Sequence, residues 1–294
     1  MRLVSVLTNG TRYAGILDGE RVLVTDVPGL DAAIEVGIQL NSTMGHWYPL
    51  KDVKLDAPLR PPVVFCIGQN YRDHLAEKAP ITITEPEFFL KAGQTVTAPD
   101  EPCTLDPVVT AKLDYETELG VIIGKVGRNI PASLALEHVY GYIVVNDLTA
   151  RDRQVVIQGE GRYAMTLGPG KNFDGAARLA PWMVTADEIS DPQRLGLTTR
   201  VNSEVRQFNS TKNMIFNVAE TIAFLSRLMT LHPGAVIATG TPGGTGWGQD
   251  PTLGGTGQTP PGCVPARYLS SGDYVESEIE QVGRLVFTVA DKGN

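Results

Sequence analysis

The segment from Leu113 to Gly124 constrains the fold and the chemistry of this chain more than any other. Within it Glu116 and Glu118 stand two positions apart in a run that is otherwise typical of a buried β-strand. Successive side chains of a strand point to opposite faces, so we expect both carboxylates on the same side. Two like charges held side by side are unfavourable unless a cation lies between them, and a hard divalent ion bound by oxygen ligands meets that need.

The alternative is an exposed acidic edge with solvated glutamates, but the apolar run that follows Glu118 favours burial. A third carboxylate, Asp147, ends an apolar strand expected over 139–145. It either completes a set of three oxygen ligands or caps a helix expected over 147–154. The sequence leaves both roles of Asp147 open.

A histidine and a glutamate at helical spacing form a candidate acid–base pair. His74 and Glu77 lie three positions apart in segment 70–77, where we expect a helical turn after a buried strand over 63–68. A carboxylate beside an imidazole fixes its tautomer and raises its basicity, which gives a general base suited to neutral pH. Such pairs also occur on ordinary solvated helices, so the spacing alone does not decide whether His74 and Glu77 are catalytic.

Cationic and amide side chains follow the second strand, at Arg151, Gln154 and Lys171. We expect Arg151 one helical turn after Asp147, where its guanidinium is able to bind a substrate carboxylate through two hydrogen bonds. A structural salt bridge to Asp147 is the alternative, and the two are compatible. The segment 239–244, which contains Thr241, brings hydroxyls and close backbone to a strand end but lacks the lysine and helix of a phosphate-binding loop.

The composition restricts the compartment and the partners. The chain has 294 residues, a net charge of -8 and no basic tract, which argues against sequence-independent binding of nucleic acid. Its three cysteines share no close spacing, which suits a reducing compartment and supplies neither a zinc site nor a disulfide framework. The apolar N-terminal stretch is too short for a signal peptide, and no apolar run reaches membrane-spanning length. We therefore expect a cytoplasmic protein that binds neither nucleic acid nor membranes.

The chain divides at a proline-rich segment, 58–62, which predicts a stiff linker. Residues 1–60 form a small β-rich domain in this interpretation, with strands over 2–7, 13–17 and 21–24 and a helix over 31–40. Residues 61–294 form the larger domain, in which strand-like runs outnumber helices without alternating regularly with them. The sequence thus predicts a mixed α/β, β-dominated fold and not a doubly wound sheet.

Further elements of the larger domain are expected from local signals. Asn202-Ser203 predicts a hairpin between strands over 195–201 and 204–208, and strands over 235–238, 274–279 and 285–289 close the fold. A helix is expected over 131–138, and a long amphipathic helix is expected after a cap within 209–211.

Several of these segments together resemble the fumarylacetoacetate hydrolase superfamily. The resemblance is carried, in order, by Gly68-Gln69-Asn70-Tyr71-Arg72-Asp73-His74, Asp114-Tyr115-Glu116-Thr117-Glu118-Leu119, Gly141-Tyr142 through Asn146-Asp147, Ala150 to Gln154, Gly170 to Asp174, Thr239-Gly240-Thr241-Pro242 and Gly272-Asp273. These motifs span most of residues 63–294, and the first 60 residues are similar to a small extra domain that some members carry.

The resemblance implies a mixed β-roll catalytic domain, a homodimer, and one Mg²⁺ or Mn²⁺ ion held by Glu116, Glu118 and Asp147. Oxygen ligands alone also argue against zinc. The resemblance further implies a water-activating pair, His74 with Glu77, on a mobile lid. Substrate oxo and carboxylate groups would be contacted by Arg151, Gln154, Lys171 and Thr241, with Lys171 also stabilising oxyanion charge.

The reaction implied is hydrolysis of a carbon–carbon bond in a 1,3-dioxo or acylpyruvate-type acid through an enolate. A decarboxylase of oxaloacetate-like acids or an isomerase of 2-oxo or 2-hydroxy-dienoic acids would use the same site, and the sequence does not choose. Two other classes remain as alternatives. A non-catalytic binding protein is disfavoured by the retained His74 and Glu77, and a metal-dependent phosphoesterase by the lack of a second metal cluster and a phosphate loop.

Two segments are enlarged relative to the family's usual connections and flank the expected pocket, namely 155–170 and 241–265. The second is rich in glycine and proline and contains Trp247. Trp247 is expected either to cover an apolar or ring-bearing part of the substrate or to belong to a surface or dimer-contact loop that never touches ligand.

Overall fold

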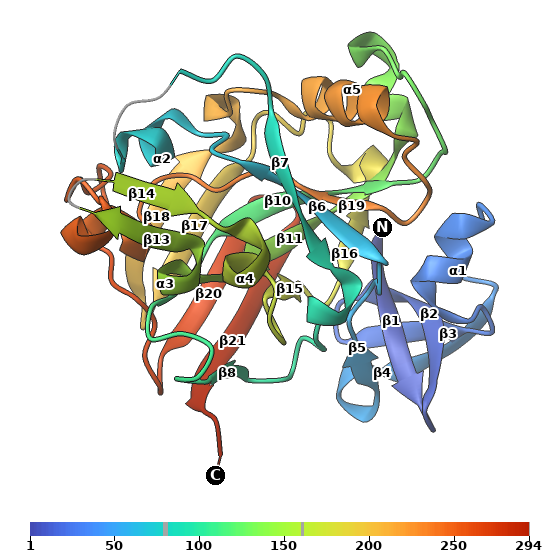
Figure 1. Cartoon of the computed structure of the whole chain (residues 1–294). Coiled ribbons are helices and arrows are strands. Elements are labelled where there is room, and N and C mark those ends of the chain that lie inside the picture. The colour runs from blue at the N-terminus through green and yellow to red at the C-terminus, as the bar shows by residue number, and fades with distance from the viewer. Residues whose placement is uncertain (79–81, 160–161, 294) are drawn as a thin grey trace.

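Strands dominate the computed structural model, which describes residues 1–78, 82–159 and 162–293 (Figure 1). In this part of the chain the largest sheet has the strand order β4 (Gly45–Pro49), β3 (Arg21–Thr25), β2 (Thr11–Asp18), β1 (Arg2–Thr8), β16 (Met183–Thr185), β11 (Val139–Asp147), β10 (Thr117–Ile123), β19 (Val236–Ala238), β6 (Val63–Gly68) and β7 (Glu87–Ala92). Two short strands join it at the side, β5 (Lys54–Asp56) on β1 and β15 (Ala177–Leu179) on β11.

A second sheet has the order β18 (Glu204–Ser210), β17 (Gly196–Val201), β20 (Tyr274–Ile279), β21 (Gly283–Asp291) and β8 (Cys103–Leu105). Separate ladders join β9 (Leu113–Asp114) to β12 (Thr149–Ala150) and β13 (Val155–Gly159) to β14 (Arg162–Met165). The helices are α1 (Gly29–Glu35), α2 (Arg72–Ala76), α3 (Arg151–Gln154), α4 (Leu167–Lys171) and α5 (Val218–Leu228). Short 3₁₀ turns are η1 (Leu50–Asp52), η2 (Gly93–Thr95), η3 (Ala132–His138), η4 (Ala186–Glu188), η5 (Thr211–Asn213), η6 (Gly246–Gln249) and η7 (Pro251–Leu253).

Hydrogen-bonded hydroxyls join the two sheets behind β10. Thr117 donates to Ser277 over 2.7 Å and accepts from Thr199 over 2.6 Å, and all three are fully buried. Because buried polar groups are costly without partners, these bonds fix how β10 sits on the second sheet. They also fix which face of β10 points away from that sheet.

The first 60 residues lie beside the rest of the fold as a group of blue strands (Figure 1). β1 pairs with β2 along its length and also with β16 through Arg2 and Leu3, so this group continues the main sheet. The strands expected over 2–7, 13–17 and 21–24 are present with slightly wider bounds. The division of the chain into two domains at residue 60 stays a prediction.

Two expectations near the acidic segment are wrong. The strand expected through 113–124 is interrupted, since β9 ends at Asp114 and β10 begins at Thr117. β9 pairs with β12, whereas β10 pairs with β11, so the ladder partner changes between them. The helix expected over 147–154 begins only at Arg151, because β11 runs to Asp147 and Thr149–Ala150 joins β9. Asp147 is therefore not a helix cap.

The other helices also begin or end elsewhere than expected. α1 ends at Glu35, well before residue 40, and Gly37 follows it with φ +72°, a conformation that terminates helices. Segment 131–138 forms the 3₁₀ turn η3. Asn217, and not a residue of 209–211, caps α5, where its side chain and that of Glu220 form a reciprocal capping box. Over the described residues, none of the helices is long and apolar enough to cross a membrane.

The corrected cap yields a stability prediction. Asn217→Ala is expected to lower the free energy of unfolding by about 1 kcal/mol, because the N–H of Glu220 loses its acceptor. Ser210→Ala is the matched control, since Ser210 accepts a longer bond of 3.4 Å at the short turn η5. Urea unfolding of both variants measures the difference. An equal or larger loss for Ser210→Ala would contradict the assignment.

Candidate active site

Three buried carboxylates converge at the centre of the main sheet. One oxygen each from Glu116, Glu118 and Asp147 lies within 4.8 Å of the others, and each residue is at most 4 % exposed. Glu118 belongs to β10 and Asp147 ends β11, the neighbouring strand, while Glu116 lies just before β10. The N–H of Asp147 donates to the carbonyl of Glu116 over 2.8 Å, which keeps the two segments together at this point.

Glu116 and Glu118 lie on the same face, as expected from the alternation of side chains along a strand, although the strand is interrupted before Thr117. Thr117 points to the second sheet and bonds Ser277 there, whereas Glu116 and Glu118 face the opposite side and line one cavity. The cavity has an empty volume of about 500 Å³, part of it open to solvent.

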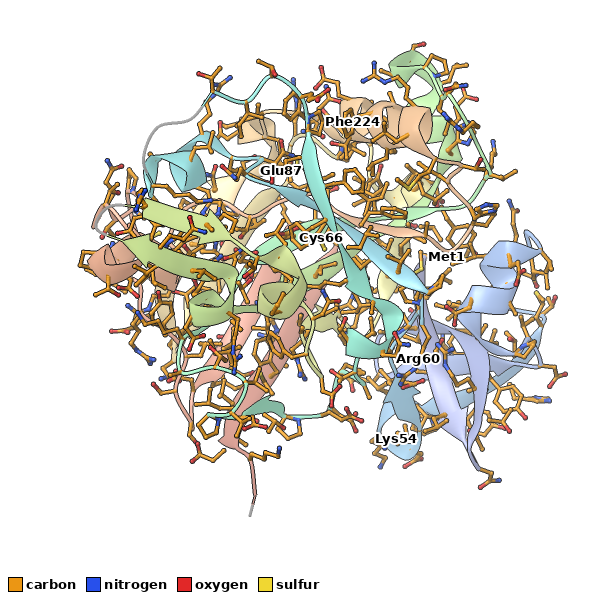
Figure 2. The ribbon with its side chains drawn as sticks, in the orientation of Figure 1. Met1, Lys54, Arg60, Cys66, Glu87 and Phe224 are labelled. Atoms are coloured by element: carbon orange, nitrogen blue, oxygen red, sulfur yellow. The ribbon has the colours of Figure 1, made fainter. Side chains whose placement is uncertain are left out.

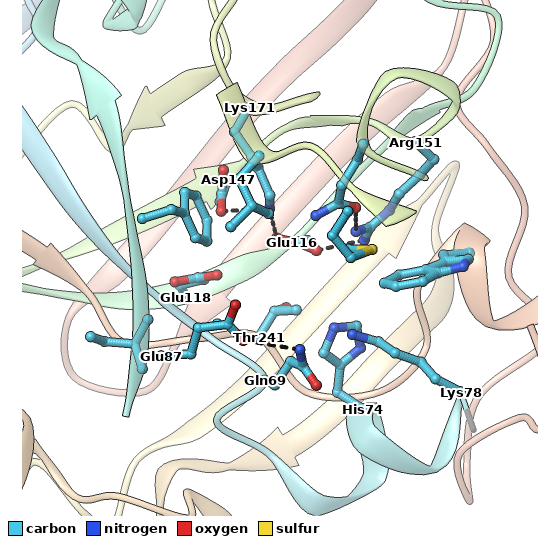
Figure 3. A pocket seen from close by; sticks show the side chains of 17 residues that line it. Gln69, His74, Lys78, Glu87, Glu116, Glu118, Asp147, Arg151, Lys171 and Thr241 are labelled. Carbon is cyan, nitrogen blue, oxygen red and sulfur yellow. Dashed lines mark hydrogen bonds and ion pairs between the residues drawn. The ribbon is translucent and has the colours of Figure 1, made fainter. Parts of the chain in front are cut away.

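Lysine and arginine side chains surround two of the three carboxylates (Figure 3). The Lys171 ammonium donates to Glu116 over 2.5 Å and to Asp147 over 2.7 Å. Lys91 Nζ lies 2.7 Å from Asp147 Oδ1, although its hydrogen bonds go to the carbonyls of Leu148 and Ala176. The Arg151 guanidinium donates to Glu116 over 2.5 Å.

Glu118 differs from its neighbours and shows that the site suits a cation. It accepts one N–H, from Gly240 over 2.7 Å, and no lysine or arginine among the described residues lies within 4.0 Å of it. Burial and the charges of Asp147 and Glu116 raise the pKa of Glu118 well above its usual range. Asp147 Oδ1 has the Lys91 ammonium 2.7 Å away but accepts no well-aligned hydrogen bond in the described part of the chain. These oxygens fit a divalent cation of the Mg²⁺ or Mn²⁺ type.

The negative charge of Glu116 is better compensated by neighbouring cations than that of Glu118. Burial raises its pKa, but Lys171 and Arg151 lower it more, so that the pKa lies below its usual range. Asp147 and Glu116 in turn outweigh burial at Lys171 and raise the pKa of its ammonium. Lys171 therefore stays charged beside the carboxylates.

His74 and Glu77 form a buried pair on α2 and the turn that follows it. His74 Nδ1 lies 2.7 Å from Glu77 Oε2, which leaves Nε2 free to exchange a proton. Glu77 also accepts the N–H groups of Gly244 and Thr245 over 2.6 and 3.1 Å. A side chain at Gly248 would meet Glu77 Oε1 at 2.5 Å, so this approach requires glycine. Glu77 thus ties the pair to the segment 241–265.

Arg151 reaches partners other than the one expected. Its Nε, Nη1 and Nη2 donate to Asp114, Gln154 and Glu116 over 2.7, 2.7 and 2.5 Å, and it makes no salt bridge to Asp147. The helical-face argument for Arg151 and Asp147 was wrong because α3 begins at Arg151 itself. Every guanidinium nitrogen already donates to a protein oxygen.

Of the nine site residues expected from the sequence, eight line this cavity, namely His74, Glu116, Glu118, Asp147, Arg151, Gln154, Lys171 and Thr241. Glu77, the ninth, lies behind His74 and is joined to it by a hydrogen bond. The hydroxyl of Thr241 donates to the carbonyl of Thr117 over 3.0 Å and accepts from Gln207 over 2.9 Å. The structure brings these residues together, while their individual roles stay predictions.

Sequence reasoning missed three buried or cavity-lining groups. Asp114 accepts from Arg151 and from the N–H groups of Gly246 and Trp247, so it orients the guanidinium and the loop together. Lys91 forms an ion pair with Asp147. Lys78, next to Glu77, lines the cavity. A charged residue within an apolar run, as in Phe88-Phe89-Leu90-Lys91, was the available signal for Lys91.

Both enlarged segments contribute to the cavity wall. Met165 of β14 and Leu167 of α4 line it from the first segment, although Glu160 and Gly161 lie outside the described residues. Trp247 of the second segment lines it too and is 5 % exposed, with its Nε1 donating to the carbonyl of Leu253. Trp247 is therefore not part of a surface loop remote from the cavity.

The fold and the cavity define an enzyme in which a carboxylate site suited to a divalent metal and a histidine–glutamate pair meet within a strand-dominated scaffold. The chain belongs to the fumarylacetoacetate hydrolase family, as the sequence profile described as "Fumarylacetoacetate (FAA) hydrolase C-terminal" matches residues 63–290. The family resemblance and the fold class expected from the sequence are thus confirmed.

Relatives of known sequence and structure agree with this assignment. The chain is 40% identical over 250 residues to a protein named oxaloacetate tautomerase YisK from Bacillus subtilis, covering 83% of this chain and 76% of that one. It superposes on a fumarylacetoacetate hydrolase from Exiguobacterium antarcticum with a TM-score of 0.81 and 33% identity, covering 99% of this chain and 100% of the other. A maleylpyruvate hydrolase from Sphingobium, solved with manganese and pyruvate, gives a TM-score of 0.76 at 26% identity, with both chains covered fully.

Proposed function

We propose that this chain is a divalent-metal-dependent enzyme that forms the enolate of a small 2-oxo acid. The observation that carries the proposal is the convergence of Glu116, Glu118 and Asp147 on the cavity that also contains His74. The reaction favoured is keto–enol conversion of an oxaloacetate-like acid, in which a proton moves between the oxo oxygen and the adjacent carbon. Decarboxylation of such an acid would form the same enolate by breaking a carbon–carbon bond and releasing carbon dioxide. The relative named oxaloacetate tautomerase, at 40% identity, supports this choice.

Each group has a definite task in this proposal. A Mg²⁺ or Mn²⁺ ion held by the three carboxylates would supply Lewis-acid polarisation of the oxo group. His74, with Nδ1 on Glu77, uses Nε2 to take the proton from the adjacent carbon and to return one to oxygen or carbon. The Lys171 ammonium stabilises the negative charge that develops on oxygen. Arg151, held by Asp114 and Gln154, orients the acid.

A second candidate is hydrolysis of a carbon–carbon bond in an acylpyruvate-type acid. The buried His74–Glu77 pair favours it, because the same Nε2 is able to deprotonate a water molecule that then attacks the distal carbonyl. The structural relative named maleylpyruvate hydrolase has manganese and pyruvate bound, which is consistent with this chemistry on a similar fold.

Assays with oxaloacetate and acetylpyruvate, each with Mg²⁺, Mn²⁺ or EDTA, test the proposal. Metal-dependent loss of the oxaloacetate enol, followed by ultraviolet absorbance, is the result expected. Metal-dependent cleavage of acetylpyruvate without enol turnover would favour the second candidate. Activity on neither acid with metal supplied would contradict both.

Trp247 provides a prediction about substrate size. Trp247→Ala is expected to raise the Michaelis constant about tenfold for acids with a ring or long apolar group, because they lose an aromatic wall, with a smaller change for oxaloacetate. Steady-state kinetics on both kinds of acid measure this. Trp47→Ala, at an exposed position on β4, is the matched control. Equal changes for both acids would contradict a selective role of Trp247.

Assembly and location are also proposals. We propose a homodimer, on the grounds of the family resemblance, and a cytoplasmic location, on the grounds of the cysteine usage. Light scattering that shows a single species of 31.7 kDa at working concentration would contradict the dimer.

A further inference from the structure

Lys78 is a cavity cation that the proposed chemistry does not use. It lies one residue after Glu77 and lines the same cavity as His74. Lys78 and His74 reach into the cavity from one side, whereas Arg151 and Lys171 reach in from the opposite side (Figure 3). A ligand held between these two sides would have Lys78 as a neighbour.

The lysine and arginine side chains that line the cavity, Lys78, Arg151 and Lys171, differ in their partners. Arg151 and Lys171 are paired with carboxylates at 2.5 to 2.7 Å. Lys78 Nζ lies 4.1 Å from the centroid of the Trp247 ring and has no carboxylate within 4.0 Å in the part of the chain that the structure describes. An aromatic face stabilises an ammonium only moderately, so the charge of Lys78 is available to an anionic ligand.

The environment of Lys78 also disfavours its charge when no anion is present. Burial, with the charges of Arg151 and Lys171, lowers the pKa of Lys78 to about 7, although Glu116 and Glu77 oppose the change. The other titratable groups that line the cavity with Lys78 are His74, Glu87, Glu118 and Asp147. A carboxylate arriving at Lys78 would raise its pKa again, so binding of that carboxylate is coupled to protonation of the amine.

We propose that Lys78 is a specificity residue that binds the distal carboxylate of a dicarboxylic 2-oxo acid. This inference rests on the proposed function, in which the carboxylate site of Glu116, Glu118 and Asp147 handles the oxo end of the acid. Arg151 is a poorer candidate for the distal carboxylate, since three of its five N–H groups already donate to protein oxygens and the proposed function uses the others to orient the acid. Lys78 has a compact ammonium with three donors and none committed within the described chain.

The test compares two acids that differ at the distal end. Oxaloacetate carries a distal carboxylate, and acetylpyruvate carries a methyl ketone there. Lys78→Met is expected to raise the Michaelis constant for oxaloacetate roughly 10- to 100-fold, as for loss of a hydrogen bond between charged groups, and to leave that for acetylpyruvate within about threefold. Lys78→Arg is expected to restore most of the affinity.

The pH dependence gives a second readout with a definite sign. An amine with a lowered pKa loses its charge as the pH rises, so the Michaelis constant of the wild type for oxaloacetate should increase above about pH 7. In Lys78→Arg the increase should move to higher pH, because a guanidinium stays protonated. In Lys78→Met this increase should disappear.

Two controls separate the possible failures. Arg72→Met removes an equal charge from an exposed position on α2 and should change neither Michaelis constant. Calorimetric binding of pyruvate with Mn²⁺ should be unchanged in Lys78→Met, which shows that the variant is folded. Equal effects of Lys78→Met on both acids, or no rescue by arginine, would overturn the inference while the proposed function stands. A wild type inactive on both acids, or active on acetylpyruvate alone, would overturn the inference together with the oxaloacetate-type reaction.

Discussion

Replacing Glu118 by glutamine should lower the turnover of the metal-loaded enzyme and raise the stability of the metal-free protein. With metal supplied, turnover is expected to fall roughly a thousandfold or more, because a neutral amide replaces a charged ligand. Without metal, the variant should be more stable than the wild type at neutral pH. Folding of the wild type there must either protonate Glu118 or hold its charge beside Asp147 and Glu116, and glutamine avoids both costs.

The sign of the pH dependence follows from the raised pKa of Glu118. A carboxyl group whose pKa is raised on folding destabilises the protein increasingly as the pH rises above its unfolded-state pKa. The stability advantage of metal-free Glu118→Gln should therefore vanish as the pH falls toward about 4.3, the unperturbed value for glutamate. An advantage that grows toward low pH would contradict this account.

Thermal unfolding with and without metal measures both effects. A metal at 100 times its dissociation constant stabilises the wild type by about 2.7 kcal/mol, and Glu118→Gln should lose most of that gain. Glu87→Gln is the matched control, because Glu87 lines the same cavity but does not belong to the carboxylate triad. A full metal response in Glu118→Gln would mean that the cation binds elsewhere.

Removal of the imidazole is the second large effect. His74→Ala is expected to lower the turnover number about 10²- to 10⁴-fold, the range for loss of a general base. Stabilisation by metal and affinity for pyruvate should be unchanged, because His74 contacts neither Glu118 nor Asp147 through a hydrogen bond. Rapid-mixing kinetics and calorimetry separate the two quantities.

Comparison with other variants makes the His74 experiment decisive. His46→Ala, at an exposed histidine on β4, should have wild-type turnover. Glu77→Gln should also lower turnover, but it should destabilise the protein as well, since Glu77 holds Gly244 and Thr245. A His74→Ala enzyme with near-normal turnover would exclude His74 as the base. A wild type without turnover would instead fit a binding protein with an inherited pocket.

Local patterns in the sequence were sufficient to predict most strands and the acidic pair. β6 was predicted with its observed bounds, and the hairpin at Asn202-Ser203 forms with both residues at positive φ, 53° and 70°. These features depend on apolar runs and turn residues that are close together in the chain. The convergence of Glu116 with Glu118 followed from alternation, which holds even though the strand begins only at Thr117.

Contacts between distant segments could not be predicted in the same way. The partners of Arg151 depend on the pairing of Leu113–Asp114 with Thr149–Ala150, a two-residue ladder too short to leave a periodic signal. The position of Lys171 between Glu116 and Asp147 joins three separate elements. Figure 2 shows the side chains that the many separate elements of the fold carry. Only the family resemblance suggested that these groups share a site.

The position of the metal ion tests the central claim most directly. Crystals of the protein soaked with Mn²⁺ and pyruvate should show one anomalous difference peak in contact with Glu116, Glu118 and Asp147. The account predicts carboxylate oxygens at about 2.0–2.2 Å from that peak, as for hard cations of this size. Carboxylates that diverge from one another, or a peak only outside this cavity, would contradict it.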